Sequence, residues 1–185
     1  TDGSLDVTDI DNDGDLDIII ASFSGDIVKV LKNITGDAGG FVISSISSGD
    51  GPSSVYATDI DNDGDMDIVV SYYFDSKIIW LKNVDGNGNF DLGEVITTNV
   101  TGTQSVYAAD IDNDGDMDIL SASSYYNTSN KIAWYENTDG NGAFGAQQII
   151  TTGLVGSDSV DAADIDNDGD MDVIASGGYG IIWFE

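Results

Sequence analysis

The chain has 185 residues with 34 acidic and only five basic side chains, and its net charge of −29 makes nucleic acid and anionic membranes poor partners. It contains neither cysteine nor histidine, which removes the usual zinc ligands and the usual general base. No apolar run approaches the length needed to cross a membrane, so we expect no membrane insertion.

A ten-residue motif rich in aspartate recurs along the whole chain and divides it into four repeats. The first copy reads DIDNDGDLDI, and each later copy differs from it at no more than two positions. The four copies lie at 9–18, 59–68, 110–119 and 164–173. Their starts are 50, 51 and 54 residues apart, which is the spacing of a protein built from repeats of one structural unit.

Each repeat contains the same series of short segments rich in β-forming residues. An alternating polar and apolar segment precedes the motif, beginning at Ser4, Ser54, Ser105 and Ser159. A β-rich run follows the motif, and a third apolar segment comes next, at 27–33, 77–83, 131–137 and 181–185. In the middle repeats a DGNG turn then precedes a fourth segment, and such glycine turns are typical of hairpins.

These segments predict four short antiparallel strands in each repeat, and no window shows the period of a helix. The two middle strands carry apolar residues on both alternating faces, as strands do when both faces are covered. Four-stranded units stacked face to face are the blades of a β-propeller, so we expect one all-β repeat domain over 1–185. The alternative is a β-solenoid, which would need shorter and more regular rungs. The expected blades cover 4–49, 54–99, 105–153 and 159–185, the last lacking its fourth strand.

The aspartates of the motif have the spacing of a calcium-binding loop. Counted from the first aspartate, acidic side chains fall at positions 1, 3, 5, 7 and 9, and glycine falls at position 6. Alternate oxygen ligands, a glycine for the sharp turn and a backbone carbonyl ligand at position 7 are typical of calcium loops. An EF-hand adds a glutamate at position 12, which these repeats lack, so the ninth-position aspartate is expected to complete the ligand set.

We therefore predict about four bound Ca²⁺ ions, one in each motif. Five carboxylates in one compact loop repel one another, and a bound cation would remove that repulsion. The candidate ligands are Asp9, Asp11, Asp13, Asp15 and Asp17, then Asp59, Asp61, Asp63, Asp65 and Asp67, then Asp110, Asp112, Asp114, Asp116 and Asp118, and finally Asp164, Asp166, Asp168, Asp170 and Asp172.

The DxDxDGxxD motif, followed by a β-rich strand and a strand of the type WLKN, resembles the FG-GAP or VCBS repeat family. Blades of that family also build the propeller of the integrin α-subunit. The resemblance implies that each motif joins the first two strands of its blade and binds Ca²⁺. The chain lacks the Phe-Gly and Gly-Ala-Pro flanks of integrins, so it is closer to the secreted bacterial type, and integrin ligand recognition is not implied.

Aromatic residues cluster in the connections that we place at the end of the blades opposite the motifs. Variable loops on a rigid scaffold are where binding sites usually lie, so these rings are candidate carbohydrate-binding residues. They are Tyr72, Tyr73, Phe74, Tyr125, Tyr126 and Tyr179. The three tryptophans, by contrast, share one position of the third strand, which favours packing between blades. They are Trp80, Trp134 and Trp183.

The sequence therefore predicts a calcium-stabilised, non-enzymatic module of a secreted or cell-surface protein that serves adhesion, recognition or assembly. Its partner would be a glycan or a surface protein. An extracellular location is expected because weak calcium loops fill where calcium is millimolar. The alternative is part of a polysaccharide-degrading enzyme, which the absence of arginine and histidine disfavours. The incomplete last blade also predicts either a longer chain or a homo-oligomer that covers its edge.

Overall fold

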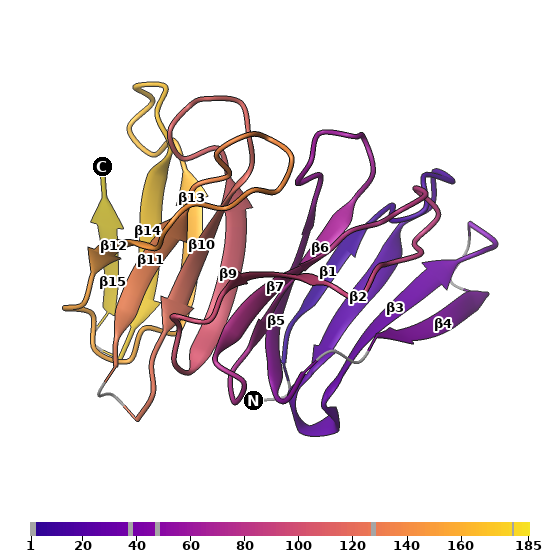
Figure 1. The fold of residues 1–185 in the computed structure, drawn as a ribbon, viewed down its shortest axis with the longest axis horizontal. Helices are drawn as coiled ribbons and strands as arrows, with labels where there is room; N and C mark the ends of the chain where they lie inside the picture. Colours follow the sequence, from indigo (N-terminus) through magenta and orange to yellow (C-terminus); the bar gives the residue numbers. More distant parts are fainter. Residues whose placement is uncertain (1–2, 37–38, 47–48, 127–128, 179) are drawn as a thin grey trace.

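The computed structural model describes residues 3–36, 39–46, 49–126, 129–178 and 180–185. Within these residues it contains 15 strands, one 3-10 turn (η1, Phe23–Gly25) and no α-helix. Among the described helices, none has the length and apolar character required to span a membrane. The strands form four separate antiparallel sheets that lie side by side (Figure 1).

Each motif repeat builds one sheet, with its strands paired in the order of the sequence. The first sheet consists of β1 (Leu5–Thr8), β2 (Asp17–Ser22), β3 (Ile27–Asn33) and β4 (Phe41–Ile46). The second consists of β5 (Pro52–Thr58), β6 (Asp67–Tyr72), β7 (Lys77–Leu81) and β8 (Glu94–Thr97). The third consists of β9 (Thr103–Ala109), β10 (Asp118–Ser123), β11 (Lys131–Tyr135) and β12 (Gln148–Thr151). The fourth has three strands, β13 (Ser159–Ala163), β14 (Asp172–Gly177) and β15 (Gly180–Phe184).

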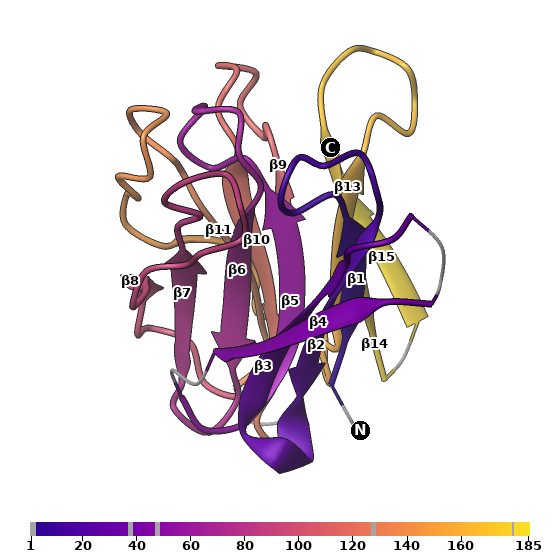
Figure 2. The same ribbon diagram turned by 90° about the vertical axis from the view of Figure 1, so that its right-hand side faces the viewer.

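The sheets are arranged as the blades of a β-propeller, with the first strand of each blade innermost. Strand β5 lies between β1 and β9, and β9 lies between β5 and β13 (Figure 1; Figure 2 gives the view after a quarter turn). At the end where these strands begin, all four blades line one cavity of about 310 Å³. The expectation of an all-β propeller is therefore confirmed. A solenoid would instead place equivalent strands of successive repeats in one continuous sheet.

The apolar core consists of three layers, one between each pair of neighbouring blades. Every residue of β6 and of β10 is buried, because these strands have a blade on either side. Val70 faces the first layer and Val69 faces the second. This two-sided burial explains why the middle strands carry apolar residues at consecutive positions. In β2 of the first blade, buried residues alternate with half-buried ones.

The tryptophans only partly follow the expectation of packing between blades. Trp80 is buried in the second layer, and Trp134 packs against the third. Trp183 instead remains 47% exposed on β15 of the last blade, as do its neighbours Ile181 and Ile182 at 78% and 38%.

The innermost strands are also joined from blade to blade by serine side chains. A serine at the start of each of the first three innermost segments accepts a hydrogen bond from a backbone N–H of the next blade. The pairs are Ser4 with Val55, Ser54 with Val106, and Ser105 with Val160, at 2.8, 3.3 and 3.4 Å. The repeated serine of the sequence therefore serves the contact between blades.

Candidate functional site

The four aspartate motifs form the loops between the first and second strands of each blade, all at the same end of the molecule (the upper edge in Figure 1). In the second loop, Asp59 accepts hydrogen bonds from the backbone N–H of Asp63 and of Gly64, at 3.1 and 2.9 Å. Asp63 in turn accepts one from the N–H of Asp65, at 3.0 Å. The other three loops repeat these bonds, so the aspartates fold each loop back on itself.

Two positions of the loop adopt a left-handed backbone, which explains their residue types. The fourth position is asparagine with φ between 57° and 62° in all four loops, and asparagine tolerates this conformation well. The sixth position is glycine with φ between 93° and 102°, where a side chain would be strained although the space around it is open.

The ninth-position aspartate is buried beneath each loop. Asp67 is fully buried and accepts hydrogen bonds from the N–H of Ile60 and of Asn83, at 3.2 and 2.8 Å. It therefore ties the loop to the end of the third strand. Burial raises the pKa of Asp67 from 3.8 to about 6, against the opposing effect of these N–H donors. Burial raises the pKa of Asp118 to about 6 in the same way.

Carboxylate oxygens from positions 1 and 3 converge in every loop, together with position 5 or position 9. Within the described residues, each group has ligand atoms within 4.8 Å of one another. The groups are Asp9 with Asp11 and Asp13, Asp59 with Asp61 and Asp67, Asp110 with Asp112 and Asp118, and Asp164 with Asp166 and Asp172. A further group joins Asp166 and Asp168 to Glu185, a residue that the motif spacing alone does not identify.

The donor atoms of these loops fit a hard divalent cation. The side chain of Asp61 is only 9% exposed, and its Oδ1 atom has no hydrogen-bond partner among the described residues. Oδ1 of Asp11 is buried and unpartnered in the same way. Such an oxygen carries an uncompensated desolvation cost unless a cation neutralises it. Clustered carboxylate oxygens are the ligands that calcium prefers, whereas zinc favours nitrogen and sulfur.

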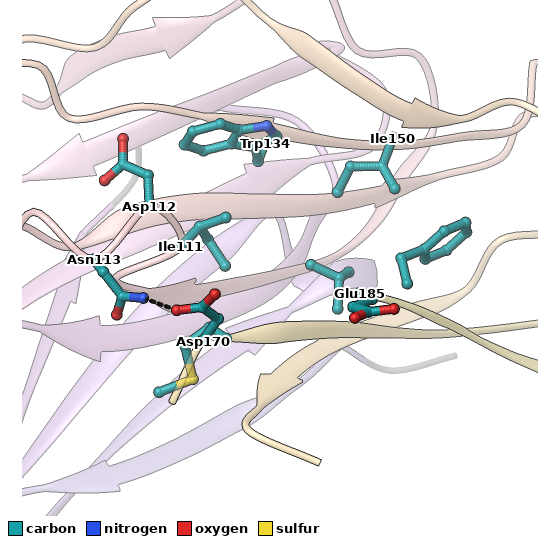
Figure 3. Close-up of a pocket in the computed structure, with 10 residues that line it drawn as sticks. Ile111, Asp112, Asn113, Trp134, Ile150, Asp170 and Glu185 are labelled. Atoms are coloured by element: carbon teal, nitrogen blue, oxygen red, sulfur yellow. Dashed lines mark hydrogen bonds between the residues drawn. The ribbon is translucent and has the colours of Figure 1, made fainter. Parts of the chain in front are cut away.

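The side chain at position 7 lies outside these groups, and in the last three blades it contacts the preceding blade instead. The fourth-position asparagine of one loop donates to the seventh-position aspartate of the next. The pairs are Asn12 with Asp65, Asn62 with Asp116, and Asn113 with Asp170 (Figure 3), at 2.9, 2.9 and 2.6 Å. A role for this asparagine could have been suspected from its presence in all four motifs, but its partner lies a full repeat away.

A buried asparagine at the end of the third strand makes a second connection between loops. Asn83 donates through Nδ2 to the carbonyl of Ile10 in the preceding loop, at 2.9 Å, and to that of Met66, at 3.2 Å. Its Oδ1 accepts the N–H of Gly88 in the hairpin turn, at 3.1 Å. Asn137 makes the same contacts one blade later. Each of these asparagines therefore joins two loops and one turn.

The aromatic candidates are divided by the structure into exposed and buried residues. Tyr72 is only 1% exposed and belongs to the core between the first two blades, so its assignment to a ligand site was wrong. Phe74, Tyr125 and Tyr126 are 56%, 37% and 78% exposed, and Tyr73 is partly buried. Tyr179 lies outside the described residues.

The exposed rings belong to one aromatic cluster that spans three blades. Phe23, which the sequence did not single out, contacts Tyr73 and Phe74 with ring centroids 5.7 and 5.2 Å apart. Tyr73 continues the cluster to Tyr125 at 5.9 Å, and Tyr125 contacts Tyr126 at 4.5 Å. These residues belong to the connections between second and third strands, at the end opposite the aspartate loops.

The positions on either side of the loop glycine give a test of which atoms would bind an ion, because Asp63 precedes Gly64 and Asp65 follows it. Asp63→Ala removes a side chain at position 5, whereas Asp65→Ala keeps the backbone carbonyl at position 7. We expect a clear loss of calcium affinity in the first variant and little change in the second, measured by calorimetric titration. Equal losses would show that the assumed ligand order is wrong. Asp65→Ala should still lower stability slightly, because it loses the bond from Asn12.

Comparison with known proteins agrees with this architecture. The family model of the FG-GAP-like repeat matches residues 9–70, 71–121 and 118–175. No curated protein matches the chain in a sequence search. Among solved structures, the chain is similar to BBS1N in its complex with ARL6DN, a crystal soaked with lead, with a TM-score of 0.60 and 13% identity. The match covers 94% of this chain and 50% of that chain, and at this identity the similarity concerns the fold alone.

Proposed function

The chain belongs to the FG-GAP-like repeat family, and from this premise we propose that it is a calcium-stabilised propeller module of a secreted or cell-surface protein. The observation that carries the proposal is the convergence of three carboxylates in each of the four loops. In two of the loops, a buried carboxylate oxygen has no hydrogen-bond partner within the part of the chain that the structure describes. A cation in each loop would neutralise these oxygens. The ions would thereby stabilise the contacts between blades, while the opposite end remains available for recognition.

The number of bound ions tests this proposal directly. Equilibrium dialysis against calcium, followed by elemental analysis, should find about four ions for each chain. Asp61→Asn, which changes one third-position ligand, should reduce the count toward three at a free calcium concentration just sufficient to give four ions in the unaltered chain. Asp91→Asn is a suitable control, because Asp91 lies outside the loops and its carboxylate binds local backbone N–H groups. A chain that binds no calcium, or that loses ions equally in both variants, would refute the proposal.

A module of this kind would act in adhesion, recognition or assembly, and we propose that it acts without catalysis. The clustered carboxylates lie in the loops described above, where a cation would engage them, and the chain has no arginine or histidine to serve as a clamp or base. Contact with another blade, from a second copy or from a longer chain, stays a prediction. The exposed Ile181 and Trp183 of β15 support it.

We further propose a neutral glycan as the ligand of the aromatic cluster. Sugar rings stack on exposed aromatic faces, and carboxylates beside the rings accept hydrogen bonds from sugar hydroxyls. Two carboxylates are held near the cluster by backbone bonds, because Asp26 accepts the N–H of Gly51 and Asp75 accepts the N–H of Asp50, at 3.0 Å each. Gly51 lies directly against the ring of Phe74.

Replacement of the two most exposed rings should abolish glycan binding without unfolding the protein. Phe74→Ser combined with Tyr126→Ser should remove the signal on a glycan array, with a loss of stability of about 1 kcal/mol or less. Tyr72→Ser provides the contrast, because this core residue should reduce stability far more. An unchanged array signal in the double variant would exclude these rings as the site.

A further inference from the structure

One position of the third strand lies beside each aspartate loop and differs in charge between blades. The third strand pairs with the second as far as Leu31, Leu81, Tyr135 and Phe184, each opposite the residue that follows the ninth-position aspartate. The residues that come next are Lys32, Lys82, Glu136 and Glu185. The first two blades therefore place a cation beside the loop, and the last two place an anion there.

In the second blade the lysine reaches directly into the candidate metal site. Nζ of Lys82 forms ion pairs with the carboxylates of Asp61 and of Asp63, the residues at positions 3 and 5. The distance to Asp63 Oδ2 is 3.0 Å. The other oxygen of Asp61 is buried and has no hydrogen-bond partner among the described residues. The ammonium group therefore engages part of the oxygen set that would hold a cation.

The equivalent side chains of the other three blades make different contacts with their surroundings. Nζ of Lys32 is 3.6 Å from Asp11 Oδ2 and donates to the carbonyl of Asn87 in the next blade at 2.7 Å. Glu136 accepts a long hydrogen bond, 3.4 Å, from Gln148 on the neighbouring strand. Glu185 has a carboxylate oxygen within 4.8 Å of those of Asp166 and Asp168, and it lines a cavity of about 400 Å³ together with Asp170 (Figure 3).

We propose that this strand position sets a different calcium affinity for each loop. Lys82 is a tethered cation that competes with calcium for Asp61 and Asp63, and Lys32 does the same more weakly at Asp11. Glu185 supplies an additional carboxylate to the fourth loop. The proposal rests on the proposed calcium-binding function. It assigns a role in calcium affinity to residues that lie outside the aspartate motif. Calcium should fill the fourth loop first and the second loop last.

The physical reason is the charge of the flanking group. A fixed positive charge at about 5 Å from a divalent cation opposes binding by about tenfold, even with the screening of water. A carboxylate at the same place acts in the opposite direction and adds a ligand oxygen. Release of Lys82 from its two ion pairs must accompany calcium binding in the second loop. The four nearly identical motifs therefore need not be four equivalent sites.

The sixth-position glycines allow the four loops to be followed separately. Each loop has one such glycine, whose N–H donates to the first-position aspartate at 2.9 to 3.1 Å. The amide signals of the uniformly labelled protein report on the loops through Gly14, Gly64, Gly115 and Gly169. During a titration with buffered calcium, we expect Gly169 to respond at the lowest concentration and Gly64 at the highest.

The decisive variant is Lys82→Met, with Lys77→Met as the matched control. Both remove one positive charge, but Lys77 pairs with Asp75 at the far end of the strand. Lys82→Met should shift the midpoint of Gly64 to about tenfold lower calcium and leave Gly169 unchanged. Lys77→Met should shift neither. An unmoved Gly64 midpoint, or the same shift in both variants, would overturn the proposal.

Two further variants keep the test valid if Lys82→Met does not fold. Lys32→Met should move the Gly14 midpoint to lower calcium, and Glu185→Gln should move that of Gly169 to higher calcium. The absence of both shifts would overturn the proposal as well. If no glycine of the unaltered protein responded to calcium, the calcium-binding function itself would fail, and that result is distinct from four sites of equal affinity.

Discussion

Removal of calcium should lower the melting temperature of the protein steeply, and its return should restore it. For a site with a dissociation constant of ~10 μM in ~1 mM calcium, mass action contributes about 2.7 kcal/mol to stability. Four such sites would together contribute about as much as the whole stability of a typical domain. Thermal unfolding followed by circular dichroism, with and without a calcium chelator, measures the effect.

Sodium chloride at matched ionic strength is the necessary control for this experiment. A chain of net charge −29 gains stability from any salt, because ions screen its self-repulsion. If calcium binds specifically in the loops, millimolar calcium should restore the part of the melting temperature that sodium chloride of equal ionic strength does not restore. Recovery in sodium alone, or a melting curve indifferent to the chelator, would contradict calcium-dependent stability.

The chelated protein should also respond to pH in the direction opposite to the calcium-loaded protein. Asp67 and Asp118 have pKa values raised by burial to about 6 in the folded state, against 3.8 as the ordinary value. Between these values the folded state binds more protons than the unfolded state, so stability falls as pH rises. Without calcium, melting should therefore occur at higher temperature at pH 5 than at pH 7. With calcium it should occur at lower temperature at pH 5, because protons compete with the ion.

The arrangement of the blades could be predicted from the sequence because each repeat carries its own complete signal. The motif predicts the loop, and the apolar residues on both faces of β6 indicate that this strand lies between two blades. The misassignment of Tyr72 could have been avoided in the same way. In a strand, Tyr72 lies on the same face as Val70, and the two share one core layer.

Contacts between repeats could not be predicted, because they depend on how blades stack rather than on local pattern. Asn12 and Asp65 are 53 residues apart, and nothing in the motif shows that one side chain faces the next loop. The full aromatic cluster could not be predicted for the same reason, because Phe23 contacts it from the first blade. The charge at the position of Lys82 can be read from the sequence. Its role beside the loop can be inferred only from the ion pairs with Asp61 and Asp63 in the structure.

Replacement of the buried asparagine between loops should cost more stability than its size suggests. Asn83→Ala removes two hydrogen bonds donated to the carbonyls of Ile10 and Met66 and one accepted from Gly88. Asn83 is fully buried, so these backbone groups would lose partners without gaining water. We expect a loss of about 2–4 kcal/mol, measured by urea unfolding at saturating calcium.

The first blade provides a matched control for this change, because its equivalent asparagine lacks these cross-blade bonds in the described part of the chain. Asn33 is only half-buried, and its side chain accepts a long bond of 3.4 Å from the N–H of Thr35. Its backbone N–H binds Asp17 as that of Asn83 binds Asp67, and alanine keeps this contact. Asn33→Ala should therefore cost less than about 1 kcal/mol. Similar losses in the two variants would mean that the asparagine serves its own blade and does not join neighbouring loops.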